Sequence, residues 1–184
     1  MKSPNKLESR ETWLREATKL IRPHFVVCGF PIPENIRFAI AFPSTGRKGQ
    51  RVGELWHSTT SDDGHFELIV RADVADPVEV LGILTHELIH AVLPMDAGHG
   101  KLYKAAAIKI GLQGKMMHAM PGPLLTPRLA EIAEALGPLP HARLNIDRAG
   151  PIRAKARRTG PKSRERVCSR PCAKALALAV TRSA

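Results

Sequence analysis

The chain has 184 residues, enough for one domain of ordinary size, and a formal net charge of +11. No apolar run approaches the roughly 20 residues that cross a bilayer, and the first residues lack the apolar segment of a signal peptide. Three cysteines cannot form a paired disulfide framework, so we expect a cytoplasmic protein.

The positive charge is concentrated at one end of the chain. Residues 141–184 hold 12 basic and 2 acidic residues, whereas residues 1–140 hold 16 basic and 15 acidic ones. Every aromatic residue lies at or before Tyr103. We therefore expect a folded domain over 8–140, followed over 141–184 by a basic, disordered tail rich in Pro and Arg.

The first part of the domain predicts one helix and three strands. Ser9 can cap a helix over 8–22, which Pro23 ends. Three β-rich stretches follow, separated by turns short enough for antiparallel pairing. They lie at 36–42, 52–58 and 65–71.

Three further helices are predicted, over 77–93, 101–112 and 126–137. The first has the strongest signals, because Asp76 is a natural N-cap and Pro77 suits the first helical position. Thr126 and Pro127 offer the same pair at the start of the last helix. Strands that cluster ahead of helices indicate an α+β fold.

The strongest predicted helix carries the sequence His86-Glu87-Leu88-Ile89-His90. Two histidines four residues apart lie on one helical face, so both imidazoles can reach one metal ion. Glu87 follows the first histidine, where it can take a proton from a water molecule at the metal. The competing interpretation is an amphipathic helix whose histidines are merely polar.

A zinc site needs a third protein ligand, and the chain offers three candidates. His99 is favoured, because the glycines on either side of it allow a loop to bring its ring back to the first two histidines. Asp96 stands six residues after His90, but Leu93 and Pro94 disfavour the tight turn that this ligand position needs. His118 is the remaining candidate.

The segment HELIHAVLPMDAGHGKLYKAAAIKIGL resembles the motif of the SprT-like (Spartan-related) zinc metallopeptidases, in which HExxH is followed by a loop and by HGxxF on a second helix. Tyr103 stands where the family usually has Phe. The resemblance covers roughly residues 10–140 and is greatest to the compact bacteriophage and prophage members. For a chain encoded by a phage, it implies a location in the cytoplasm of the bacterial host. It implies a minimal zincin fold, one Zn²⁺ per chain held by His86, His90 and His99, and Glu87 as the catalytic residue.

These observations predict a hydrolase that cleaves peptide bonds in a protein or peptide substrate. We expect the substrate to pair with an edge strand, for which 65–71 is the best candidate. The group that stabilises the transition-state oxyanion is not evident, and His57, His65 and Tyr103 are candidates. Trp56 is expected in the core, with a place in the wall of a pocket as the alternative.

The tail predicts an anionic partner, because clustered basic residues bind phosphate backbones without reading sequence. DNA or another polyanion fits this chemistry. The densest basic stretch comprises Arg153, Lys155, Arg157, Arg158, Lys162, Arg164 and Arg166. Relatives often end in a zinc ribbon with two pairs of cysteines, but here Cys168 and Cys172 are the only pair. The resemblance therefore implies a ribbon that is degenerate, truncated or absent. We expect two free cysteines, with a zinc site shared between two chains or a disulfide-linked dimer as the alternatives. The alternative function is a non-catalytic, zinc-containing protein associated with nucleic acid and transcription.

Overall fold

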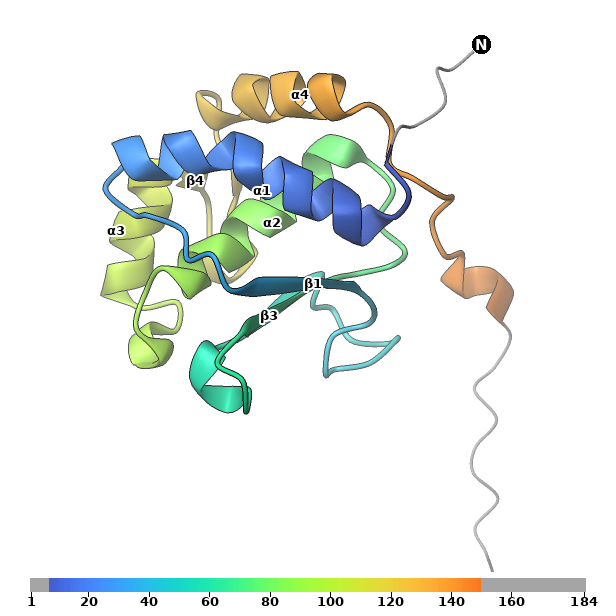
Figure 1. The fold of residues 1–184 in the computed structure, drawn as a ribbon, viewed down its shortest axis with the longest axis horizontal. Helices are drawn as coiled ribbons and strands as arrows, with labels where there is room; N and C mark the ends of the chain where they lie inside the picture. The colour runs from blue at the N-terminus through green and yellow to red at the C-terminus, as the bar shows by residue number, and fades with distance from the viewer. Residues whose placement is uncertain (1–6, 150–184) are drawn as a thin grey trace, which may run out of the picture. The chain divides into compact units, whose positions relative to one another are not determined.

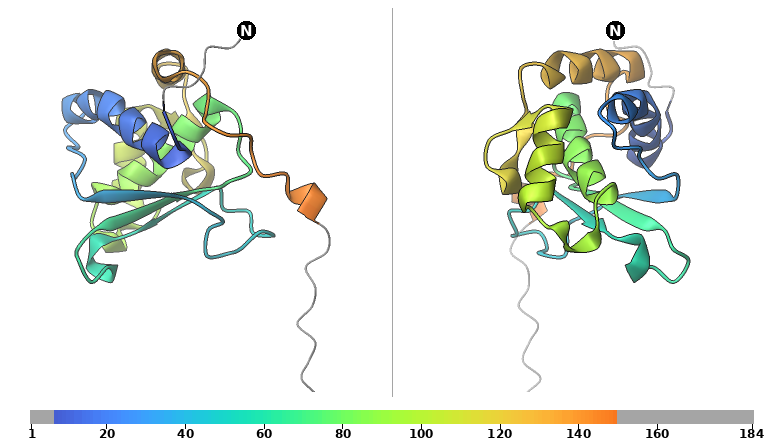
Figure 2. Two further views of the ribbon diagram at one scale, coloured as in Figure 1. Left: turned by 45° about the vertical axis from the view of Figure 1, so that its right-hand side comes forward. Right: turned by 90° about the vertical axis from the view of Figure 1, so that its left-hand side faces the viewer.

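The computed structural model describes residues 7–149 of the chain. It is a mixed α+β structure in which helices cover one face of a small sheet (Figures 1 and 2). The four helices are α1 (Arg10–Val27), α2 (Pro77–Ala91), α3 (Lys101–Ile110) and α4 (Leu125–Leu136). Within residues 7–149, no helix is long and apolar enough to cross a membrane.

The main sheet contains β1 (Ile36–Ile40), β2 (Gly53–Trp56) and β3 (Phe66–Val70) in the order β1-β3-β2. β2 pairs with β3 in antiparallel fashion, as predicted, but β1 pairs with β3 in parallel. The prediction of a fully antiparallel sheet was therefore wrong. Since β3 lies in the middle, the prediction that 65–71 is an edge strand was also wrong.

A second, two-stranded sheet joins β4 (Leu112–Gln113) to β5 (Met120–Pro121), between α3 and α4. Short 3-10 turns complete the fold: η1 (Ser58–Thr60), η2 (Met95–Ala97), η3 (Met116–His118) and η4 (Ile146–Ala149). β5 packs against α2, where a Cβ built on Gly82 would lie only 2.9 Å from Cγ of Pro121. This contact places the segment between α3 and α4 beside the central helix.

The core lies between the helices and the inner face of the sheet. Leu68 and Val70 of β3 are fully buried there, and each such side chain contributes about 1.5–3 kcal/mol. The helices supply most of the largest buried side chains of the core, which are Trp13, Leu14, Ile21, Phe25, Leu81, Leu84, Leu88, Ile89, Tyr103, Ile110 and Leu125. α2 crosses the middle of the layer and contacts the other three helices.

Each helix differs from its predicted range at one end or both, and the end of α1 and the start of α4 are the informative cases. α1 continues through Pro23 to Val27, because Phe25 is buried and the Nε2 atom of His24 lies 2.8 Å from the Ile110 carbonyl oxygen. Tertiary contacts therefore outweigh the hydrogen bond that proline removes. α4 begins at Leu125, and the hydroxyl of Thr126 donates to the Gly122 carbonyl instead of capping the helix.

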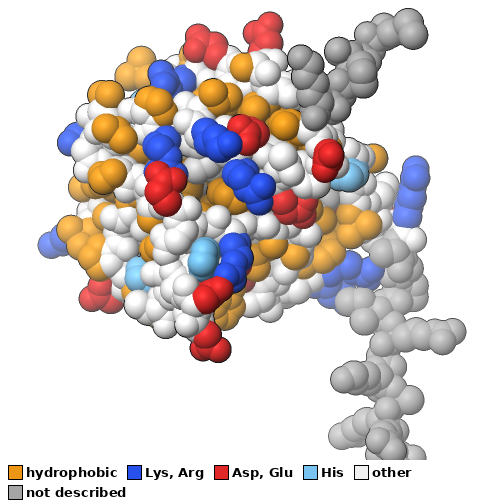
Figure 3. Space-filling view, viewed as in Figure 1, with side chains coloured by type: hydrophobic (Ala, Val, Ile, Leu, Met, Phe, Trp, Pro, Cys, Tyr) orange, Lys and Arg blue, Asp and Glu red, His pale blue; other side chains and the backbone are white. Residues whose placement is uncertain are grey.

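The chain after α4 returns to the folded domain. Arg10 donates from Nε to the Pro140 carbonyl at 3.2 Å, and the Leu144 N–H donates to the Ala72 carbonyl at 2.9 Å. Residues 141–149 thus contact the domain that was expected to end at 140. On the face that Figure 3 shows, Lys and Arg side chains are interspersed with Asp and Glu side chains. On α1, Lys19 forms an ion pair with Glu16.

Candidate metal centre

α2 holds the first two histidines on one face. The helix begins as predicted, with the Asp76 side chain accepting a hydrogen bond from the Glu79 N–H at 2.8 Å and with Pro77 in the first turn. The ring centroids of His86 and His90 lie 5.3 Å apart, one helical turn from each other. The helix therefore presents both imidazoles to the same point, as the spacing predicted.

His99 reaches the same point from the loop between α2 and α3. Pro94 follows the end of α2, η2 turns the chain, and Gly98 adopts a positive φ of 47° that favours glycine. The Nε2 atom of His99 lies 3.1 Å from Nε2 of His86 and 3.2 Å from Nε2 of His90. The glycine-flanked loop thus brings the predicted third histidine to the first two.

These three side chains could hold a metal ion, since one potential ligand atom from each lies within 4.8 Å of the others. Zinc binds imidazole nitrogen at about 2.0–2.1 Å, so nitrogen ligands of a tetrahedral site are about 3.3 Å apart. The two measured separations fit this geometry. Asp96 and His118, the other candidate ligands, are not part of the cluster.

The ring of Tyr103 packs against the rings of all three histidines. Its ring is completely buried, with its centroid 4.5 Å from that of His90, 4.9 Å from that of His99 and 5.1 Å from that of His86. Its hydroxyl donates to the His86 carbonyl oxygen at 3.3 Å. The side chain therefore packs beneath the histidines, and its hydroxyl, which was one candidate for stabilising an oxyanion, is bonded to the backbone of α2.

The surroundings keep the histidines neutral, which is the form that binds a metal. Burial, together with the neighbouring imidazoles, lowers the pKa of His86 to about 3 and that of His90 to about 4. Burial also lowers the pKa of His99, and the charges of Arg51 and His118 act in the same direction. The His86 ring also forms a hydrogen bond with the backbone of Ala119. Hydrogen bonds of this type orient imidazoles that bind a metal.

Glu87 lies beside the cluster and is only 6% exposed. Burial raises its pKa to about 8; the nearby charge of Glu54 adds to the rise, and Arg51 opposes it. Glu54 is itself fixed, because it accepts hydrogen bonds from the N–H and hydroxyl of Ser44 and from Arg51. A carboxyl with a raised pKa next to potential metal ligands has the properties of a general acid and base.

Sequence reasoning missed the contact between β2 and Glu87. Gly53, at the start of β2, lies so close to the helix that a built Cβ would be 2.6 Å from Oε1 of Glu87. The two residues are 34 positions apart, and no local pattern signals that they meet. The only available sign was a glycine at the start of a predicted strand, which can mark a close approach of the backbone.

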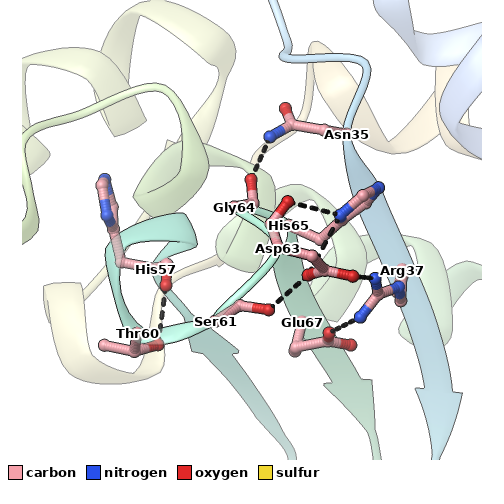
Figure 4. Close-up of polar contacts among 9 residues, drawn as sticks. All are labelled: Asn35, Arg37, His57, Thr60, Ser61, Asp63, Gly64, His65 and Glu67. Atoms are coloured by element: carbon pink, nitrogen blue, oxygen red, sulfur yellow. Dashed lines mark hydrogen bonds and ion pairs between the residues drawn. The ribbon is translucent and has the colours of Figure 1, made fainter.

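His57 and His65, both suggested as oxyanion donors, lie around the loop between β2 and β3. The Nδ1 atom of His57 is 3.0 Å from the hydroxyl of Thr59. His65 is turned toward Asp63, with its Nδ1 atom 3.2 Å from the carboxylate, and Asp63 also pairs with Arg37 of β1 (Figure 4). Both rings therefore bond to side chains of their own loop, and neither belongs to the metal-binding cluster.

Trp56, expected in the core, is 46% exposed at the end of β2. It pairs with Glu67 of β3 on the face of the sheet away from the helices, whereas Leu55 and Leu68 pair on the core side. The residues of a strand alternate between faces, so the position of Leu55 in the core places Trp56 on the opposite face.

The basic residues proposed to bind nucleic acid, from Arg153 to Arg166, lie outside the described residues, as do Cys168 and Cys172. Comparisons of the chain with protein-family models, curated proteins and solved structures find no match. The site therefore rests on its residues and their geometry.

Proposed function

We propose that this protein is a zinc-dependent endopeptidase of the SprT-like type. The observation that carries the proposal is the convergence of three Nε2 atoms from His86, His90 and His99, with the buried carboxyl of Glu87 beside them. Three imidazoles and an open fourth position are the donor set of a catalytic zinc. A purely structural zinc has no need for a neighbouring buried carboxyl, so Glu87 favours catalysis.

Each residue has a distinct role in this proposal. The three histidines hold the zinc, which when bound supplies a Lewis acid and lowers the pKa of a water molecule toward 7. Glu87 accepts a proton from the attacking water and delivers it to the amine nitrogen that leaves. Tyr103 keeps the histidine rings in place through its buried ring contacts.

The substrate pairs with β2 in this proposal, because β2 is the edge strand that adjoins Glu87. The N–H of Arg71 donates to the Val52 carbonyl, and hydrogen-bonded pairs alternate along an antiparallel ladder. The backbone groups of Gly53 and Leu55 therefore point away from β3, toward the open edge. An extended polypeptide can add to such an edge through main-chain hydrogen bonds, which suits cleavage with little dependence on sequence.

The test is cleavage of a fluorescent casein by the zinc-loaded protein and by Glu87→Gln. We expect the variant to retain one zinc per chain and to lose cleavage by at least about 10³-fold, since the loss of the proton carrier affects the chemical step. Glu79→Gln, the same change on an exposed part of the same helix, is the control and should leave cleavage unchanged. A wild-type protein that holds zinc and cleaves nothing would instead support the non-catalytic alternative.

The basic tail adds a proposed partner. Its net charge of +10 favours DNA or another polyanion, bound through phosphate groups. We propose that this segment tethers the peptidase near proteins that are associated with nucleic acid. Cleavage of such a protein should then accelerate when DNA is added at low salt, and the acceleration should disappear at high salt.

A further inference from the structure

Gly53 is the residue of β2 that lies against Glu87. A Cβ built on it would be 2.6 Å from Oε1 of Glu87, 3.0 Å from Cγ of Glu87 and 2.6 Å from Cγ2 of Ile83. Ordinary van der Waals contacts of a Cβ atom are 3.4–4 Å. Even the smallest side chain at this position would therefore overlap with the Glu87 carboxyl by about 1 Å.

Glycine is needed at position 53 because there is no room for a Cβ atom, and not because the backbone conformation requires it. Gly53 lies in a regular strand, and its φ is outside the left-handed region that other residues avoid. The atoms it would meet belong to two side chains one turn apart on α2, Ile83 and Glu87. β2 and α2 therefore enclose the Glu87 carboxyl between strand backbone and helix.

We infer that Gly53 is a positioning residue for the proposed reaction: its bare backbone leaves the space that seats the Glu87 carboxyl beside the three histidines. This inference rests on the proposed function. The geometry predicts that Gly53→Ala displaces the carboxyl by about 1 Å while the three histidines stay in place, because none of their atoms is among those that the added Cβ would meet. A misplacement of this size can reduce catalysis by about 10²-fold.

The experiment compares wild type, Gly53→Ala and the control Gly82→Ala in the zinc-loaded full-length chain. Gly82 is on the same helix, and its added Cβ would press on Pro121, 2.9 Å away, instead of on Glu87. For Gly53→Ala we expect a fall of about 10²-fold in kcat for fluorescent casein, with KM and the zinc content unchanged. Gly82→Ala should keep kcat within about threefold of wild type.

A double-mutant cycle separates positioning from general damage to the fold. If Gly53 acts through Glu87, adding Gly53→Ala to Glu87→Gln should reduce the residual activity by less than about threefold. An equal loss in both backgrounds, or a kcat for Gly53→Ala within about threefold of wild type, overturns the inference. If Gly53→Ala does not fold, Gly53→Ala/Ile83→Leu removes the clash with the Ile83 methyl group at nearly constant volume, and Ile83→Leu alone is its reference.

Crystal structures of the metal-free wild type and Gly53→Ala provide a readout that does not depend on activity. A shift of the Glu87 carboxyl by about 1 Å relative to the three imidazoles supports the inference, and an unmoved carboxyl overturns it. If wild type cleaves nothing, the proposed function fails, and this structural comparison still decides whether Gly53 positions Glu87.

Discussion

The buried carboxyl of Glu87 predicts how the stability of the metal-free protein changes with pH. Burial raises the pKa of Glu87 to about 8, whereas an unfolded glutamate titrates near 4.5. Between these values the folded chain holds a proton that the unfolded chain has released. The resulting stabilisation is complete below pH 4.5 and is lost as the pH rises through 8.

The magnitude follows from proton linkage. One pKa unit corresponds to about 1.4 kcal/mol, so Glu87 should remove about 2 kcal/mol of stability between pH 6 and pH 8. The histidines act in the opposite direction at lower pH: the lowered pKa values of His86 and His90 stabilise the fold above about 6.5, and this contribution is lost as the pH falls toward 3–4. Because unfolded histidines titrate near 6.5, they still contribute between pH 6 and pH 8, and comparison with a variant that lacks only the Glu87 carboxyl isolates Glu87.

The assay is urea unfolding, followed by circular dichroism in the presence of a chelator, of wild type and Glu87→Gln. Glutamine has nearly the same shape and does not titrate, so the free energy of unfolding of wild type should fall by about 2 kcal/mol more than that of the variant between pH 6 and pH 8. Parallel pH profiles for the two proteins would refute the reasoning, since they would mean that Glu87 is already ionised in the folded, metal-free chain.

Three further predictions concern the scaffold and the tail. Arg71→Leu should lower the free energy of unfolding by about 3 kcal/mol in urea titrations, because it leaves the Asp73 carboxylate without its paired guanidinium and the Gly49 carbonyl without its donor; a loss below about 1 kcal/mol would contradict this. Tyr103→Phe should bind zinc nearly as tightly as wild type, whereas Tyr103→Ala should bind it at least about tenfold more weakly in competition with a chelator; equal affinities would mean that the ring does not support the histidines. Replacing the seven basic residues from Arg153 to Arg166 by Gln should reduce the slope of log K against log salt for duplex DNA by as much as about 6, and an unchanged slope would place DNA binding elsewhere.

The helix that carries the first two histidines was predictable because its signals are local. Asp76 and Pro77 mark its start, and the spacing of His86 and His90 places them on one face. His99 was also predictable, since the glycines beside it permit the turn that the structure contains. In each case the information lies within a few residues of the feature.

The order of strands was not predictable in the same way. The alternation in 65–71 indicates one buried face, but a central strand of a sheet with one open face alternates just as an edge strand does. The parallel pairing of β1 with β3 depends on where the connection over 41–52 runs, and turn residues do not specify this. The contact of Gly53 with Glu87 depends on that sheet order, because the order determines which strand backbone lies beside this part of α2.

The central claim is that three histidines hold one catalytic zinc. The most direct measurement is the metal content of the purified wild-type protein and of His99→Ala by mass spectrometry after dialysis against a weak chelator. We predict close to one zinc per wild-type chain and a large loss in His99→Ala, whose two remaining histidines form an incomplete site. A wild-type protein without zinc, or a His99→Ala variant that retains it fully, would contradict the account.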